Sequence, residues 1–179
     1  MKSKAIEACR ILNDILGDLV VGTRTIDIYS MPSISSQMSE KLEVGVTRLC
    51  IFHLIISLHK YIQFYKHYKN IIPEEARVSC KELMKILIGK KIPEFRNKVV
   101  GHIWDNAKKA PITEVEHDYY TELICGNDLK SFLLWINNPQ KSTDSVTVVF
   151  IVEQTRNMIA EKYRIQGGEV FNKINVADS

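Results

Sequence analysis

The stretch LCIFHLIISL, residues 49–58, is the most apolar part of the chain and indicates where the core lies. A membrane-spanning helix needs about 20 apolar residues, whereas this run has about ten, contains His53 and follows Arg48. We therefore expect a buried core helix and no membrane span. The helix should begin after Ser39, an N-cap residue with Glu40 in the first turn, and should extend over about 40–70.

On both sides of this stretch the apolar residues recur at helical spacing. A first helix is expected over about 4–28, where Ile6, Cys9 and Leu12 begin one stripe. The Met31–Ser36 segment and residues 105–111 are expected to be loops. Pro73, Pro93, Thr113 with Glu116, Asn127 and Thr143 are the expected start signals of the later helices. These helices cover about 73–88, 93–104, 113–126, 127–137 and 143–165.

The sequence thus predicts an all-α protein, a single-domain up-and-down bundle of about five to seven helices. The domain is expected to span 1–168, with Gly167 and Gly168 ending the last helix and 169–179 forming a flexible tail. One segment is ambiguous, because the β-branched residues 145–152 also suit a strand. A lone strand would have no partner nearby, so we favour a helix there.

Composition excludes several classes of protein. With 179 residues, 45% of them hydrophobic and 25% charged, the chain is neither disordered nor low in complexity. A net charge of +3 is too small to indicate a nucleic-acid binder by itself, although it leaves room for a local basic groove. The four cysteines are far apart in sequence, which argues against a zinc ribbon and a CxxC redox motif. Free thiols and the absence of a signal-peptide pattern suggest a cytoplasmic protein.

One segment combines side chains that could perform chemistry, namely EFRNKVVGHIWD, residues 94–105. Arg96 can bind a phosphate and stabilise charge developing on it, and His102 can move protons near neutral pH. Asn97 can orient the phosphate or the imidazole. Because the 2′-hydroxyl of RNA supplies a nucleophile, these three residue types suffice for RNA cleavage without a metal or other cofactor.

The spacing within this segment raises a geometric problem. In a straight α-helix, at about 100° per residue, Arg96 and His102 lie about 240° apart. Either Gly101 distorts the helix, or the long arginine side chain reaches around it, or two chains share the site across a twofold axis. A second match, Arg48 followed by His53, lies in the apolar core stripe and lacks a polar residue after the arginine, so we regard it as accidental. No histidines stand at metal-ligand spacing, and no metal site is expected.

The Arg96-Asn97-(x4)-His102 arrangement resembles the signature of the HEPN superfamily, and the order of the helices is similar to that of its abortive-infection members. The resemblance implies a homodimer with metal-independent endoribonuclease activity, often as a toxin or anti-phage effector whose antitoxin is a separate chain. It implies that Arg96 binds the scissile phosphate, that Asn97 positions it or the imidazole, and that His102 is the general acid or base. Lys98, Trp104, Lys108 and Lys109 would contact RNA, although Trp104 also suits the core and the lysines a solvated face.

Two alternatives remain open. Some HEPN members lack activity and serve as helical dimerisation or binding modules, and the motif would then have a structural role in an interface. The chain could also be an unrelated helical bundle in which the motif is accidental. The exposure of the motif and its surroundings in the fold bear on this choice.

Overall fold

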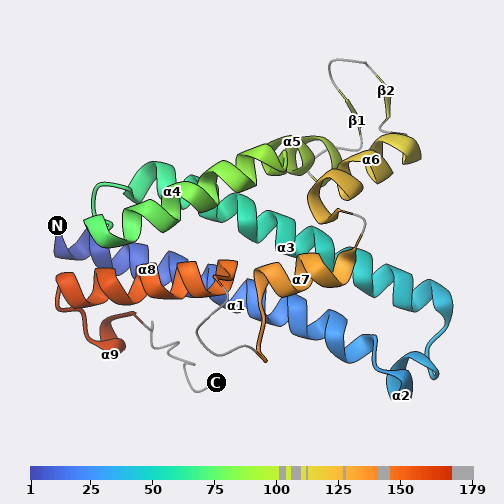
Figure 1. Ribbon diagram of the computed structural model, residues 1–179, viewed down its shortest axis with the longest axis horizontal. Coiled ribbons are helices and arrows are strands. Elements are labelled where there is room, and N and C mark those ends of the chain that lie inside the picture. The colour runs from blue at the N-terminus through green and yellow to red at the C-terminus, as the bar shows by residue number, and fades with distance from the viewer. Residues whose placement is uncertain (101–103, 106–109, 112, 127, 141–145, 171–179) are drawn as a thin grey trace, which may run out of the picture.

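The computed structural model describes residues 1–100, 104–105, 110–111, 113–126, 128–140 and 146–170. It confirms an all-α helical bundle (Figure 1). The elements are α1 (Lys2–Tyr29), α2 (Pro32–Ser35), α3 (Glu40–Tyr68), α4 (Glu74–Gly89), α5 (Ile92–Phe95), the π-helical η1 (Arg96–Val100), β1 (Trp104–Asp105), β2 (Ala110–Pro111), α6 (Glu114–Cys125), α7 (Leu129–Ile136), α8 (Val148–Lys162) and α9 (Gly167–Val170). The described residues thus form nine α-helices. This exceeds the expected five to seven because α2, α5 and α9 are four-residue turns.

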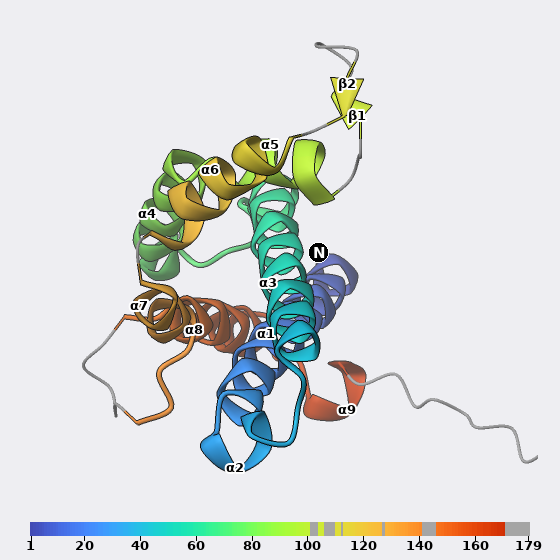
Figure 2. The ribbon, with the colours of Figure 1, turned by 90° about the vertical axis from the view of Figure 1, so that its right-hand side faces the viewer.

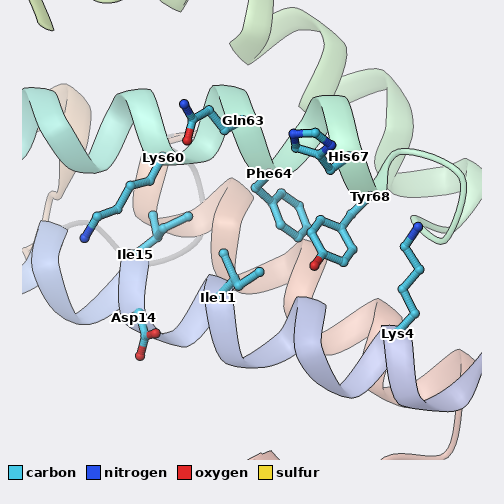
Figure 3. Close-up of a pocket in the computed structure, with 9 residues that line it drawn as sticks. All are labelled: Lys4, Ile11, Asp14, Ile15, Lys60, Gln63, Phe64, His67 and Tyr68. Atoms are coloured by element: carbon cyan, nitrogen blue, oxygen red, sulfur yellow. The ribbon is translucent and has the colours of Figure 1, made fainter.

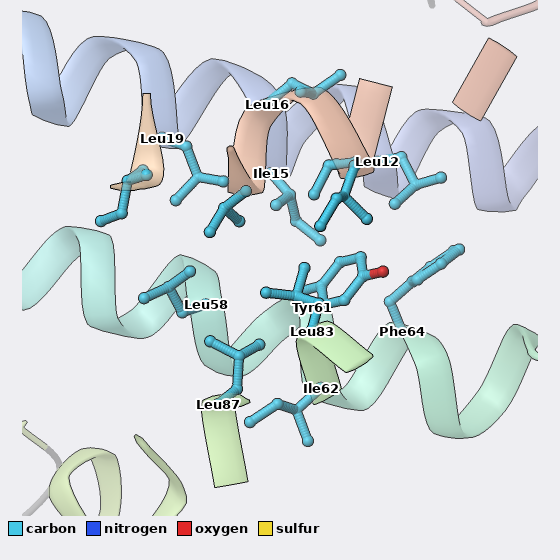
Figure 4. Close-up of a cluster of buried hydrophobic side chains, with 14 of the residues drawn as sticks. Leu12, Ile15, Leu16, Leu19, Leu58, Tyr61, Ile62, Phe64, Leu83 and Leu87 are labelled. Atoms are coloured by element: carbon cyan, nitrogen blue, oxygen red, sulfur yellow. The ribbon is translucent and has the colours of Figure 1, made fainter. Parts of the chain in front are cut away.

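The core lies between α1 and α3, with α8 against α1 and α4 against α3 and α8. Most of the 49–58 stretch is confirmed as core, since Leu54, Ile55 and Leu58 are completely buried. Figure 4 shows Leu58 within the cluster of buried side chains. At Gly22 of α1 a Cβ atom would lie 2.8 Å from Cδ2 of Leu54, so glycine permits the two long helices to approach closely. Cys9, Cys50 and Cys80 are buried free thiols, as expected.

The exposed side of α3 is also apolar in part. Leu42 and Leu49 are 54% and 70% exposed. By length and composition α3 is apolar enough to cross a membrane, and 33% of its most apolar 18-residue window is buried inside the protein. The core helix of a soluble protein passes the same test, and Leu54, Ile55 and Leu58 of α3 are completely buried.

Several helix boundaries follow the predicted capping residues. The Ser39 hydroxyl accepts a hydrogen bond from the Leu42 amide, and Thr113 and Glu116 form a complete capping box at the start of α6. The prediction for α7 is wrong by one residue, because Asp128 and not Asn127 caps it; Asn127 lies outside the described residues. Residues 148–152 are helical, and Thr147 caps α8. For this part of the 145–152 segment the helix that we favoured is confirmed.

Three other expectations are wrong in detail. The Met31–Ser36 loop contains the helical turn α2, since Pro32 is at its first position, where proline is favourable. The Gly167-Gly168 pair begins α9 instead of ending a helix. Arg10 of α1 donates hydrogen bonds to the carbonyls of Glu169 (2.9 Å) and Val170 (3.3 Å). These two residues, expected in the flexible tail, are therefore held against α1, while 171–179 lie outside the described residues.

The expected helix over 93–104 also differs. The α-helical winding ends at Phe95, η1 continues to Val100, and Trp104–Asp105 form a strand. Trp104, predicted to end that helix, pairs with Pro111, and Asp105 pairs with Ala110 in an antiparallel arrangement. Asp105, Ala110 and Pro111 belong to the segment predicted to be a loop. Both strands project from the α5–α6 end of the bundle, away from the core (Figure 2).

Candidate functional site

The predicted motif begins at a residue that is anchored in the core. Phe95 is completely buried and makes edge-to-face contacts with Phe52 of α3, at 5.8 Å between ring centroids, and with Tyr120 of α6, at 6.5 Å. Aromatic pairs of this geometry stabilise a fold beyond the area that they bury. The side chains that follow Phe95 are therefore attached to a rigid point where α3, α5 and α6 meet.

The backbone changes its winding directly after Phe95. From Arg96 to Val100 the chain is π-helical, and such turns form i→i+5 hydrogen bonds and frequently occur at functional sites. A distortion of the motif helix was one of the three expected solutions to the spacing problem, but it begins at Arg96 instead of Gly101. A wider turn increases the number of residues per turn, which brings residues five apart closer to one face than in an α-helix.

Arg96 and Asn97 are both exposed. The guanidinium Nη1 of Arg96 donates a hydrogen bond of 3.1 Å to Oδ1 of Asn97. The amide thus orients one side of the guanidinium, whose remaining N–H groups can bind a phosphate or carboxylate. The structure therefore brings together two of the three predicted catalytic residues.

Two further cations lie against the aromatic rings that contact Phe95. The Lys98 Nζ lies 5.6 Å from the ring centroid of Tyr120, and the Arg48 guanidinium lies 5.6 Å from that of Phe52. Phe95 contacts both rings, so each of the two cations is one ring away from the residue that precedes the motif. From the sequence we assigned Arg48 to the apolar core stripe, as part of an accidental match. In the structure Arg48 is instead an exposed cation beside Phe52.

Sequence reasoning also gave no role to His59 of α3. Burial lowers the pKa of His59, and the positive charges of Arg96 and Lys66 lower it further. An imidazole with a depressed pKa is neutral at pH 7 and can accept a proton. The signal available in the sequence was that His59 follows Phe52 by seven residues, which places both on one side of α3.

The other predicted site residues lie wholly or partly outside the described part of the chain. His102, Lys108 and Lys109 lie outside the described residues, and Trp104 is placed by its backbone in β1. The histidine of the accidental match differs from its prediction: His53 is half-exposed and not a core residue, and its Nε2 lies 3.2 Å from Oδ1 of Asp18. Within the described ranges, no group of three acidic, histidine or cysteine side chains could hold a metal ion.

Comparisons with known proteins bear on the fold. No model of a known protein family matches the chain, and no curated protein matches it. Among solved structures, an integron cassette protein described as Vpc_cass2, from the mobile metagenome of V. paracholerae, is similar with a TM-score of 0.70. The match has 23% sequence identity and covers 89% of this chain and 98% of that chain. At this identity the match shows a shared fold alone.

Proposed function

We propose that this protein is a metal-independent endoribonuclease of the HEPN type. The observation that carries the proposal is the joint exposure of Arg96 and Asn97 on a π-helical turn that directly follows the buried Phe95. Arg96 would bind the scissile phosphate and stabilise the charge that builds on its oxygens. Lys98 and Arg48, each against a ring that contacts Phe95, would attract other phosphates of the RNA strand.

In the proposed reaction the 2′-hydroxyl of RNA loses its proton to a base and attacks the adjacent phosphorus. The P–O5′ bond breaks, a proton passes to the leaving 5′-oxygen, and a 2′,3′-cyclic phosphate remains. His102 would serve as the general base or acid, with Asn97 holding the phosphate or the imidazole in place. We also propose a cytoplasmic homodimer that acts as a toxin or anti-phage effector and is restrained by an antitoxin on a separate chain.

The decisive experiment is cleavage of RNA by the purified protein in excess EDTA. We expect products with 2′,3′-cyclic phosphate ends, and we expect Arg96→Ala and His102→Ala each to lower the rate at least about a hundredfold. Arg24→Ala and His53→Ala are matched controls, because Arg24 is exposed on α1 and His53 belongs to the accidental match. Folded variants and wild type that all fail to cleave would favour the non-catalytic binding module.

A mixing experiment tests whether the site is shared between two chains. If Arg96 of one protomer acts with His102 of the other, a heterodimer of Arg96→Ala with His102→Ala contains one intact site of two. Random assembly of equal amounts should then restore about a quarter of the wild-type activity. If both residues act within one chain, mixing restores none of it.

A further inference from the structure

One side of α3 carries basic side chains and no carboxylate. Residues 44–73 contain no aspartate or glutamate, although the average of the chain, 21 acidic residues in 179, would place about three or four in a stretch of this length. Arg48, His59 and Lys66 follow one another at intervals of eleven and seven residues. At about 100° per residue they fall within about 20° of one another around α3. These three residues therefore form one row along the helix, which we call the basic stripe.

The arginine and the lysine of the basic stripe are available to a ligand. Arg48 and Lys66 are exposed, and His59 is half-buried. Neither Arg48 nor Lys66 forms an ion pair with another residue in the described part of the chain. Lys60 of the same helix differs, because it points toward α1 (Figure 3) and its ammonium lies 2.8 Å from Oδ2 of Asp18. Positive charge is thus compensated on the flank of α3 that faces α1 and uncompensated along the basic stripe.

Arg96 of η1 lies beside the basic stripe. Burial lowers the pKa of His59, and the charges of Arg96 and Lys66 lower it further, so both cations lie near the imidazole. The π-helical turn packs against α3, and α5, which precedes it, lies on the opposite side of α3 from α1 (Figure 2). The carboxylate nearest to Arg96 in sequence, that of Glu94, lies 3.5 Å from Nζ of Lys91. The acidic residues of α6 belong to a helix that packs against α5 and α7.

The length and shape of the basic stripe suit one strand of nucleic acid. From Arg48 to Lys66 the helix advances about 27 Å, at about 1.5 Å per residue, and His59 lies about 16 Å from the Arg48 end. Proteins that bind single-stranded nucleic acid use positive charges that follow the backbone over about 4–16 nucleotides. A single row of cations matches one phosphate backbone, whereas recognition of duplex RNA uses contacts across two successive grooves.

We infer that a single strand of RNA lies along the basic stripe, with phosphates near its two ends on Arg48 and Lys66 and the scissile phosphate at Arg96. The inference rests on the proposed ribonuclease function and adds the path of the substrate. Because Arg96 acts on His59, which lies between the two ends, the strand extends on both sides of the reacting phosphate, as cleavage within a chain requires. Contacts to phosphates carry no base information, so binding tolerates any sequence and weakens steeply with salt.

Fluorescence anisotropy with a labelled 2′-O-methyl RNA of about twelve nucleotides tests this inference. The probe has no free 2′-hydroxyl, so the proposed reaction cannot cleave it. We expect Arg48→Ala and Lys66→Ala each to weaken binding about three- to tenfold at low salt, by the same factor for different sequences. Each variant should also reduce the slope of log affinity against log salt concentration by about 0.7. Arg24→Ala is the matched control, because it removes a positive charge from an exposed position of α1.

Three outcomes would overturn the inference. Wild type fails to bind the single strand at low salt, or Arg48→Ala and Lys66→Ala bind it with the affinity and salt slope of wild type. In the third, an RNA duplex or polyglutamate, which represents an acidic protein, displaces the labelled strand as well as an unlabelled single strand does. Both replaced side chains are exposed, so the variants should fold, and their circular dichroism spectra verify this.

A parallel assay with unmodified RNA separates this inference from the proposed function. If wild type binds the 2′-O-methyl strand through Arg48 and Lys66 but cleaves no unmodified RNA, the single-strand site is supported and the ribonuclease proposal is overturned. If wild type cleaves RNA while both variants bind and cleave as wild type does, the ribonuclease proposal stands and the path along α3 is wrong.

Discussion

Replacing Phe95 tests whether the core anchors the Arg96 surface. Phe95→Ala removes a completely buried ring, and such truncations cost about 3–5 kcal/mol. Phe95→Leu keeps most of the volume and loses the edge-to-face contacts with Phe52 and Tyr120. At about 0.5–1.5 kcal/mol for each of the two contacts, we expect this variant to lose about 1–3 kcal/mol.

Urea denaturation followed by circular dichroism measures both losses in the free energy of unfolding. Phe150→Ala is the matched control, because Phe150 is 39% exposed and should cost only about 1–2 kcal/mol. A domain with a total stability of about 5–15 kcal/mol retains its fold in the leucine variant. If Phe95→Ala is no more destabilising than Phe150→Ala, Phe95 does not anchor the motif and the reasoning is refuted.

The leucine variant also connects the anchor to the proposed chemistry. Under conditions where it is fully folded, a shift of the turn that carries Arg96 should lower RNA cleavage several-fold. We expect the effect on the rate constant at saturating RNA to exceed the effect on RNA binding, since positioning matters most in the transition state. Unchanged cleavage by a folded Phe95→Leu protein would show that the π-helical turn keeps its geometry without the ring.

Three further predictions concern stability. Burial raises the pKa of Asp18, but the hydrogen bonds from Lys60 and Ser57 and the charges of Lys60 and His53 together outweigh burial and lower it. The stabilisation is therefore present above the ordinary pKa of Asp and is lost as the pH falls through the lowered value, so Asp18→Asn should flatten the acid side of a plot of melting temperature against pH. Thr113→Ala breaks the capping box of α6 and should cost about 1 kcal/mol in urea denaturation, a loss that the conservative Thr113→Ser should largely avoid. The buried Tyr61 hydroxyl makes no hydrogen bond of normal geometry with a described residue, so Tyr61→Phe should raise the free energy of unfolding by about 1 kcal/mol, and a decrease would indicate a bound partner.

Local sequence signals predicted the long helices and their caps well. Ser39 and the Thr113–Glu116 box act on backbone groups within three residues of themselves, so no tertiary information is needed to identify them. The apolar stripe of α3 likewise depends only on helical periodicity. Predictions failed at short elements, such as the single turns α2 and α9, because the periodicity of four residues is too weak to read.

For the candidate site, the sequence by itself identified Arg96, Asn97 and His102 as a cation, an amide and an imidazole within seven residues, because residue chemistry and spacing are properties of the chain. Only the tertiary structure showed that Phe95 contacts both Phe52 and Tyr120 and that the π-helical turn starts at Arg96. Only it placed His59 near the charge of Arg96 and Arg48 against the ring of Phe52. These features depend on the packing of helices that are far apart in sequence, and packing is decided by the shapes of whole faces and not by any local pattern.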